Sequence, residues 1–474
     1  MGIKMKTTIL CLMSVSLLTP AGCAAEQTDV PSPPAAANNL AVSPARTQPP
    51  VSGHESPPEP PFTLAQCIEI ALQNNPDIVG GGFDVSAAKA EKNVAAGQRW
   101  PQIGLEGYYR HNTDDQRLIQ PRYNGEPGVF SDDILGGNIV LRMPIFTSGR
   151  IENQIRAADL LSQSETRRLA RTRQQLVFNV SQVFYNILAQ RHIVESLDFS
   201  KKVLEEHHKR VNDLIAVQRA AKVDLLRTEV RLADIEQRLV AEDNIMSILR
   251  RVLVNFLGTS SPQSKIDIIG DLELTAVNAN LSESLGLAMS QRADYLAIQK
   301  RVQAQGKNLS VAKAGHWPIV SAEASYGVRS ADNPSSHPAG TNNIEDVGFI
   351  GISAAWPIFE GGTIEARIRR EYSKLSSLRQ QLRKLELQIN LDVETAVLNI
   401  TASQKRVQAT EKSIEQAKES LRIEREKYDL GKGSITDVLD AQSALLDAQT
   451  TYYHALSDYN SAVAQWYLAI GDAK

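Results

Sequence analysis

The chain of 474 residues has few cysteines, no excess of basic charge and, beyond its amino terminus, no long apolar run. Three cysteines are too few for a disulfide framework. With 51 basic and 54 acidic side chains the formal charge is −3, which argues against a strongly basic protein that binds nucleic acid. No later segment approaches the ~18 consecutive apolar residues of a transmembrane helix. Membrane strands need no such run, so a membrane protein is not excluded.

Proline is absent from two long parts of the chain. Eleven of the 21 prolines lie between Pro20 and Pro61. The 117 residues between Pro144 and Pro262 contain none, and neither do the 117 residues after Pro357. A proline inside a helix costs ~3 kcal/mol. These two segments of equal length are therefore candidates for long helices.

Residues 1–23 have the pattern of an exported protein. Lys4 and Lys6 precede a short apolar run, and small residues follow before Cys23. The Ala-Gly-Cys ending resembles a bacterial lipobox, although Pro20 stands where that motif usually has leucine. We predict a signal peptide with lipidation at Cys23, and ordinary cleavage near this residue is the alternative. Residues 24–61 are rich in proline and alanine and are predicted to form an extended tether.

The rest of the chain follows one plan twice. Trp100-Pro101 recurs as Trp317-Pro318 at an offset of 217 residues, and Pro144-Ile145-Phe146 recurs as Pro357-Ile358-Phe359 at an offset of 213. A loop between these landmarks can absorb the difference of four residues. The repetition predicts two similar structural units, residues 62–260 and residues 261–474.

Each unit contains two segments in which apolar and polar residues alternate. The predicted strands are 102–110 and 134–146 in the first unit, and 319–329 and 347–358 in the second. Alternation with period two gives each strand one apolar and one polar face. A half-buried sheet in a soluble domain would show the same pattern. The charged side chains of the polar face are Glu106, Arg110, Arg142, Glu323 and Arg329.

The proline-free segments have apolar residues at spacings of three and four, as helices of a coiled coil do. Leu375, Leu378 and Leu382 illustrate this spacing. Helices are predicted at 150–216 and 222–257 in the first unit, and at 362–430 and 435–470 in the second. A helix as long as 362–430 would extend on the order of 100 Å. Each unit is therefore expected to form an antiparallel helical hairpin with a narrow tip.

This plan resembles the TolC-like outer-membrane efflux family. The most specific matching motifs are Pro357-Ile358-Phe359-Glu360-Gly361-Gly362 and Tyr428-Asp429-Leu430-Gly431. The resemblance implies a mainly α fold with membrane β-strands. Three chains of four strands each would form a 12-stranded β-barrel that is continuous with a periplasmic α-helical barrel. Physical chemistry agrees with such an assembly, because an open sheet edge is not stable in lipid.

The resemblance also implies function and partners. The chain would be a passive exit duct in the outer membrane, a homotrimer surrounded by lipid that works with a periplasmic adaptor protein and an inner-membrane pump. The alternative is a periplasmic coiled-coil adaptor or structural protein without a membrane barrel. The sequence contains no G-x-S-x-G, P-loop or G-x-G-x-x-G motif, so we predict no enzyme and no cofactor. We predict no metal site either, because His207 and His208 are neighbours that point apart on a solvated helix face.

Aspartates near the hairpin tips narrow the periplasmic entrance in the family. The matching positions are Asp224, Asp437 and Asp440. Asp437 has a second interpretation, because Ser434-x-x-Asp437 is also the pattern of a helix-capping box. Asp224 lacks this cap, since Ala221 stands where the second unit has Ser434.

The tip of the second hairpin supplies the other candidate residues. Tyr428 matches a family tyrosine that helps to hold the entrance closed, but Gly433 stands where its arginine partner is expected. The glycines of this tip are predicted to form a tight turn. The resemblance implies that four tip residues contact the adaptor: Leu430, Gly431, Lys432 and Gly433.

Overall fold

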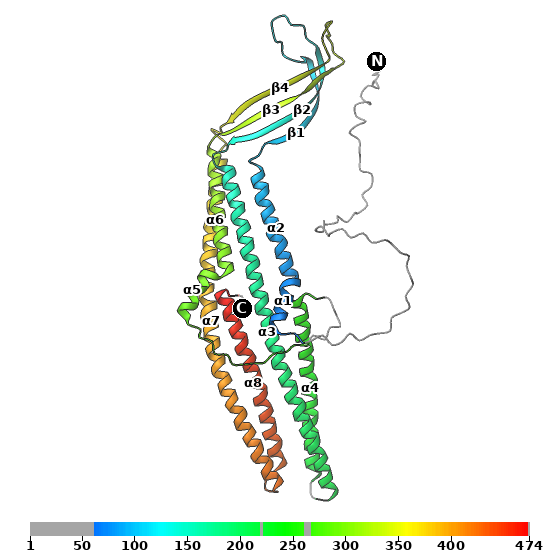
Figure 1. Cartoon of the computed structure of the whole chain (residues 1–474), viewed down its shortest axis with the longest axis vertical. Coiled ribbons are helices and arrows are strands. Elements are labelled where there is room, and N and C mark those ends of the chain that lie inside the picture. Colours follow the sequence, from blue (N-terminus) through cyan, green and yellow to red (C-terminus); the bar gives the residue numbers. More distant parts are fainter. Residues whose placement is uncertain (1–60, 219–220, 260–266, 473–474) are drawn as a thin grey trace, which may run out of the picture. The chain divides into compact units, whose positions relative to one another are not determined.

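The computed structural model describes residues 61–218, 221–259 and 267–472. The same order of elements occurs twice along the chain (Figure 1). The first repeat contains α1 (Leu64–Asn74), α2 (Pro76–Gly97), β1 (Gln102–Arg117), β2 (Phe130–Phe146), α3 (Arg150–Ala216) and α4 (Lys222–Leu257). The second contains α5 (Leu281–Gln291), α6 (Ala293–Lys313), the short turn η3 (Ala314–His316), β3 (Ile319–Asp332), β4 (Ile344–Ala355), α7 (Thr363–Asp429) and α8 (Ile435–Ile470). The predicted signal peptide, the lipidation site Cys23 and the tether to residue 60 lie outside the described residues.

The long helices begin and end at residues that cannot continue them. The predicted helix at 362–430 is one residue too long at each end, because Gly362 is the N-cap of α7 with φ of 77° and Leu430 is its C-cap. Helices α3 and α4 have the bounds predicted from the sequence, 150–216 and 222–257. None of the helices in the described part of the chain combines the length and the hydrophobicity that crossing a bilayer would require.

The four strands form one antiparallel sheet in the order β1-β2-β3-β4. All four strands extend beyond their predicted loop ends, to Arg117 in β1, back to Phe130 in β2, to Asp332 in β3 and back to Ile344 in β4. The prediction for the fourth strand was wrong at its carboxyl end. β4 stops at Ala355 rather than at residue 358, because Pro357 lacks a donor and the Trp356 indole donates to the His316 carbonyl (3.0 Å) instead.

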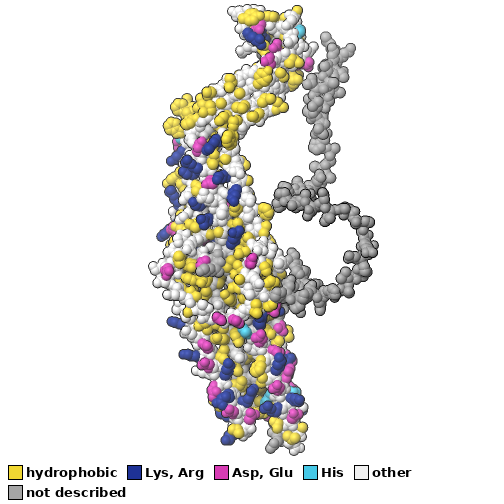
Figure 2. Space-filling model, viewed as in Figure 1, with side chains coloured by type: hydrophobic (Ala, Val, Ile, Leu, Met, Phe, Trp, Pro, Cys, Tyr) yellow, Lys and Arg dark blue, Asp and Glu magenta, His cyan; other side chains and the backbone are white. Residues whose placement is uncertain are grey.

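The two faces of the sheet differ in chemistry, as the alternation predicted. Leu105 in β1 and Ile350 in β4 lie on the apolar face and are 82% and 88% exposed in the single chain. On the other face Arg142 donates to Glu106 across β1 and β2 (3.0 Å) and lies opposite Glu323 in β3. Hydrophobic side chains cover much of the sheet in Figure 2, whereas charged side chains are frequent on the helices.

The helices pack around α3, which contacts α2, α4, α6 and α8, while α7 packs against α8, α5 and α6. The largest core lies between α1, α3 and α4 and includes Cys67, Val180, Ile187 and Leu253. Burial raises the pKa of the Cys67 thiol to about 11, so the group is neutral. The sheet lies next to the amino-terminal end of α3, and the turn into α4 lies at the other end of this helix (Figure 1).

The last helix of each repeat ends in the same way, with a glycine packed against the junction of the two short helices (α1–α2 and α5–α6). Gly258 ends α4 with φ of 67°, and an added Cβ there would lie 2.5 Å from the Asn74 carbonyl oxygen. Gly471 ends α8 with φ of 86°, and an added Cβ would lie 2.8 Å from the Cα of Arg292. These glycines are equivalent in the repeated register, and so are Asn75 and Arg292, which are both buried. The ends of α4 and α8 therefore require glycine, because a side chain there would collide with the backbone of the neighbouring helix junction.

Candidate functional site at the tips of the helical hairpins

The turns of the two hairpins each contain a left-handed residue at the equivalent position after the first helix. Gly431 follows α7 with φ of 70°, and Gln218 holds the equivalent place after α3 with φ of 60°. Glycine adopts this left-handed conformation without strain, whereas glutamine does so at a cost. At Gly433 an added Cβ would approach the Cβ of Lys427 to 3.0 Å. The tight turn expected at Gly431 and Gly433 is therefore present.

The two hairpins pack against each other just above these turns. A shared hydrophobic cluster joins Leu204 of α3 and Ile235 of α4 to Ile435 and Leu439 of α8. Tyr428, the penultimate residue of α7, packs against the same cluster and is half-buried. The cluster holds both tips together within one chain.

Three arginines of α4 reach across to α8 beside this cluster. Arg227 donates to the Thr436 hydroxyl (2.9 Å), Arg231 to Asp440 (3.2 Å), and Arg238 to Asp447 (3.2 Å). Each contact joins residues 209 apart, whereas the repeats are offset by 213, so the two helices pair with a shift of about one turn. No motif in the sequence singles out these arginines, because only the one-turn shift between α4 and α8 places them opposite their partners.

Asp437 and Asp440 lie one turn apart on α8, are both exposed and have different partners. Asp437 accepts a hydrogen bond from the Ser434 backbone N–H (3.3 Å), and the Ser434 hydroxyl accepts from the Thr436 N–H (3.2 Å). This is the capping box that the sequence offered as one interpretation. The Asp440 carboxylate is 66% exposed and pairs with Arg231.

Asp224 lies near Tyr428, although the two residues are far apart in the sequence. Ala221 provides no side-chain cap for α4, and the Asp224 carboxylate lies 3.9 Å from the Arg227 guanidinium. Burial raises the pKa of Tyr428, and the negative charge of Asp224 raises it further. The charge of Asp224 therefore acts on Tyr428, whereas Asp437 belongs to the capping box at the start of α8.

His207 of α3 completes this group, and its predicted position on a solvated face was wrong. The His207 ring meets the Tyr428 ring edge-on, with centroids 5.8 Å apart. Burial lowers the pKa of His207, the charges of Arg210 and Arg425 lower it further, and Asp224 and Asp429 oppose them. His208 points instead toward Glu229 of α4 (3.3 Å), so the neighbouring histidines do diverge.

The tip residues themselves are accessible. Leu430 is 72% exposed at the end of the α7–α8 hairpin, and Gly431 and Lys432 are exposed beside it. A groove runs along the nearby α4–α8 surface, lined by Val223, Leu226, Val230 and the Arg231–Asp440 pair, among others. The tips therefore present the exposed apolar side chain of Leu430 and the exposed carboxylates of Asp437 and Asp440, on two hairpins that pack against each other.

The profile of the family described as "Outer membrane efflux protein" matches residues 67–259 and 285–472, one segment in each repeat. Outer membrane protein TolC of Vibrio cholerae is 23% identical over 386 residues, covering 81% of this chain and 84% of the relative. The probable outer membrane lipoprotein SilC of Salmonella typhimurium is 22% identical over 404 residues, covering 81% and 80%. The crystal structure of the Campylobacter jejuni CmeC outer membrane channel superposes with a TM-score of 0.74 at 15% identity, covering 86% of each chain, which shows a shared fold.

Proposed function

The chain belongs to the outer membrane efflux protein family, and from this membership we propose that it is the exit duct of a tripartite efflux or secretion system. It is an outer-membrane channel protein and not an enzyme. The family match also decides against the alternative of a periplasmic adaptor or structural protein. The proposal concerns the assembly of the duct, its entrance and its partners.

The observation that carries the assembly is the sheet with one apolar face and two free edges. β1 and β4 are the edge strands of the four-stranded sheet, and their exposed apolar side chains lie on one face. Four strands cannot close on themselves, and an open edge is not stable in lipid. Three chains that pair β1 of one with β4 of the next would form a closed sheet of twelve strands, a size found among membrane proteins.

Adjacent residues of β4 test this assembly. Ile350 is 88% exposed on the apolar face, whereas Gly351 lies on the other face with no atom within 4 Å of an added Cβ. Ile350→Arg should place a charge in lipid at a cost of ~2–4 kcal/mol and lower the amount of trimer in the outer-membrane fraction. Gly351→Arg should leave a heat-modifiable trimer on denaturing gels. A soluble periplasmic monomer from the unsubstituted chain, or equal loss in both variants, would contradict the proposal.

The hairpin tips serve as the periplasmic entrance and as the contact for an adaptor. The exposed carboxylates Asp437 and Asp440 attract cations there, and threefold repetition would bring such charges into a ring. Leu430 and Lys432 offer the adaptor an apolar and a charged contact. A photo-crosslinking residue at Leu430 should capture a periplasmic partner in cells, whereas one at Leu398, which is exposed midway along α7, should not.

Lipidation at Cys23 is a separate proposal, because this residue lies outside the described part of the chain. SilC, which carries the word lipoprotein in its name, is one of the relatives. Cells that express the protein should incorporate labelled palmitate into it, and Cys23→Ser should abolish the label. Labelling that persists in Cys23→Ser would remove the assignment.

A further inference from the structure

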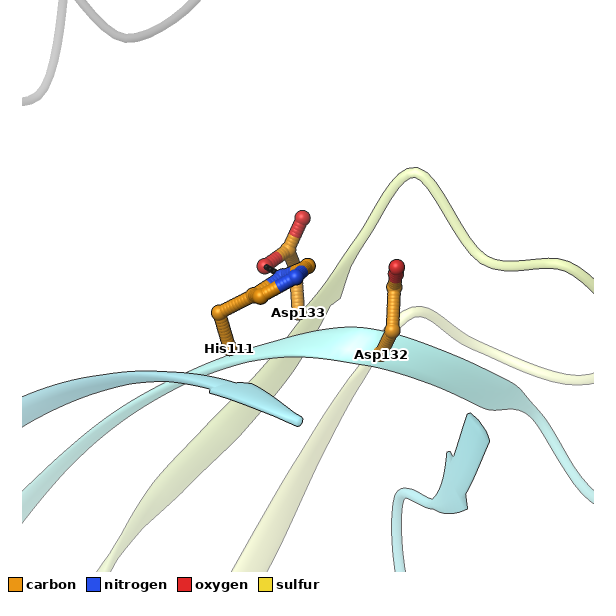
Figure 3. A group of neighbouring side chains, drawn as sticks. All are labelled: His111, Asp132 and Asp133. Carbon is orange, nitrogen blue, oxygen red and sulfur yellow. Dashed lines mark hydrogen bonds and ion pairs between the residues drawn. The ribbon is translucent and has the colours of Figure 1, made fainter. Parts of the chain in front are cut away.

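A histidine and two aspartates converge at the loop end of β1 and β2. His111 of β1 lies directly opposite Asp133 of β2 in the register, and its Nδ1 is 2.7 Å from the Asp133 Oδ1. The ligand atoms of His111, Asp132 and Asp133 all lie within 4.8 Å of one another. Figure 3 shows the three side chains projecting from the same side of the two strands. His111 and Asp133 are 22 positions apart in the sequence, with no motif that links them, and the sequence alone predicted no metal site.

The Asp132 side chain reaches this group because the β1–β2 pairing is irregular at this residue. Neighbouring strand residues normally point to opposite faces. The β1–β2 register shifts between His111 and Gln116, and Asp132 has no partner in the ladder with β1 or with β3. Its backbone is nevertheless held, because Asn112 Nδ2 donates to the Asp132 carbonyl (3.1 Å). Irregular pairing of this kind commonly redirects a side chain.

No lysine or arginine in the described part of the chain forms an ion pair with Asp132, Asp133 or Asp332. Asp332 of β3 lies opposite Asp133, so carboxylates come from two adjacent strands. The Asp133 carboxylate accepts hydrogen bonds from the Tyr109 hydroxyl (2.6 Å) and from His111. Within the described ranges the Asp132 carboxylate has neither an ion pair nor a hydrogen bond. A cation bound between His111 and the two aspartates would offset this excess of negative charge.

We propose that His111, Asp132 and Asp133 bind one divalent transition-metal ion of the Zn²⁺ or Cu²⁺ type. Imidazole nitrogen suits these ions, whereas Mg²⁺ and Ca²⁺ prefer all-oxygen sites. Ligands of one zinc ion at ~2.1 Å lie at most ~4.2 Å apart, so a small rotation of these accessible side chains completes the set. The neutral Nδ1 and both carboxylates coordinate the ion, water fills the remaining positions, and any proton on Nδ1 is released to solvent.

The position of this site separates it from the export path. Asp133 lies two residues before Leu135 and six residues before Ile139 in β2, and therefore on the apolar face of the sheet. In the proposed trimer that face is turned away from the duct. The metal site and the export duct can therefore be tested separately, because loss of metal binding need not affect transport and loss of transport need not affect metal binding.

A purely structural clamp is the competing explanation for the same geometry. In that case Asp133 would only tie Tyr109 and His111 together across the strands, and Asp132 would have no role. The two explanations differ in what Asp132→Asn and Tyr109→Phe do. Loss of the Asp132 charge weakens binding only at a metal site, whereas loss of the Tyr109 hydroxyl weakens only the clamp.

The test uses the full chain in detergent, purified through a tag without histidine. Titration with Zn²⁺ followed by calorimetry should give one ion per chain, and bound Cu²⁺ should show nitrogen coupling in its electron paramagnetic resonance spectrum. His111→Ala should remove that coupling and weaken binding at least tenfold, and Asp132→Asn should also weaken binding while the protein still assembles. Tyr109→Phe should retain binding.

His316 provides the matched control, because its ring also contacts a carboxylate, that of Glu365 (3.1 Å), and is exposed. His316→Ala should leave stoichiometry and affinity unchanged. Equal binding by the unsubstituted chain, His111→Ala and Asp132→Asn would overturn the proposal. A copper spectrum without nitrogen coupling in the unsubstituted chain would overturn it as well.

Discussion

The ring of His207 on α3 meets the ring of Tyr428 on α7 edge-on, at a centroid distance of 5.8 Å. This contact joins the two hairpins next to their tips, although the partners are 221 positions apart in the sequence. His207 Nε2 is buried and has no hydrogen-bond partner among the described residues. Protonation of this ring would therefore place a positive charge on a buried nitrogen that has no hydrogen-bond acceptor.

The contact between the hairpins should weaken in acid. The pKa of His207 in the folded chain lies below its ordinary value of 6.5, because burial and then the charges of Arg210 and Arg425 disfavour the protonated ring, against Asp224 and Asp429. The unfolded chain thus binds the proton more readily. The stability that neutral His207 contributes is present above pH 6.5 and is lost as the pH falls through the lower folded pKa. The protection factors of the tip amides, which correct for the intrinsic pH dependence of hydrogen exchange, should therefore fall as the pH drops below about 6.5.

Two variants identify the titrating group. His207→Phe keeps an aromatic ring against Tyr428 but cannot titrate, so most of the pH response relative to the unsubstituted chain should disappear. His208→Gln changes the neighbouring ring, which faces Glu229, and should retain the response. A full response in His207→Phe would mean that another group controls the tips.

The carboxylates of α8 should control cation block of the channel. Replacing both Asp437 and Asp440 with alanine should weaken block by multivalent cations in single-channel recordings, because the entrance loses two negative charges per chain. Unchanged block would remove their assignment to the entrance.

The capping role of Asp437 can be separated from its charge. Asp437→Asn keeps a side-chain oxygen that accepts from the Ser434 N–H, whereas Asp437→Ala removes it. Both should reduce block equally if charge matters, but only the alanine variant should lose ~0.5–2 kcal/mol of helix stability. Arg231→Ala should strengthen block, since it removes the positive charge 3.2 Å from Asp440.

The turn at Gly431 should be sensitive to any side chain. With φ of 70°, Gly431→Ala should cost roughly 1–2 kcal/mol and lower the midpoint of thermal unfolding, and Gly431→Asn should cost less because asparagine tolerates this conformation. Gly82 lies inside α2 with no atom within 4 Å of an added Cβ. Gly82→Ala should therefore raise the midpoint through the higher helix propensity of alanine. Opposite signs for the two alanine variants are the expected result.

Arg292 should be far more important for stability than an exposed arginine. Its side chain is 3% exposed and pairs with Asp294 (2.7 Å) and Asp392 (2.8 Å). Arg292→Ala would remove the arginine that hydrogen-bonds both of these partly buried carboxylates, at a cost of about 3–5 kcal/mol. Arg168 is the matched control, because its pair with Asp84 at 2.6 Å is 60% and 58% exposed. Arg168→Ala should cost at most about 1 kcal/mol in denaturant unfolding.

The same pair has a pH dependence of known sign. Burial acts to raise the pKa of Asp294, but the hydrogen bond from Arg292 and the charges of Arg171 and Arg292 outweigh it and hold the pKa below 3.8. The stability contributed by ionised Asp294 is thus present above pH 3.8 and is lost as the pH falls through the lower folded pKa. Arg292→Ala should reduce this acid sensitivity, and an unchanged acid transition would contradict the role of the pair.

Periodicity and proline placement were sufficient to predict the helices and most of each strand. Helix bounds such as 150–216 follow from local rules. Gly149 and Gly362 are the N-caps of α3 and α7, and their left-handed conformation interrupts the helix. The strand ends were less predictable. Pro357 ended β4 earlier than its alternation indicated, and β1 continued to Arg117 through polar residues without a clear pattern.

The sequence by itself determined the duplicated hairpins, the two-faced strands and the turn at Gly431, because spacing, proline and glycine act over a few residues. Tertiary structure alone decided which distant groups meet: Arg231 with Asp440, His207 with Tyr428, and His111 with Asp133. These contacts depend on the one-turn shift between the packed helices α4 and α8 and on the register shift between β1 and β2. A one-turn or one-residue change in these packings alters every partner while leaving the local pattern of the sequence the same.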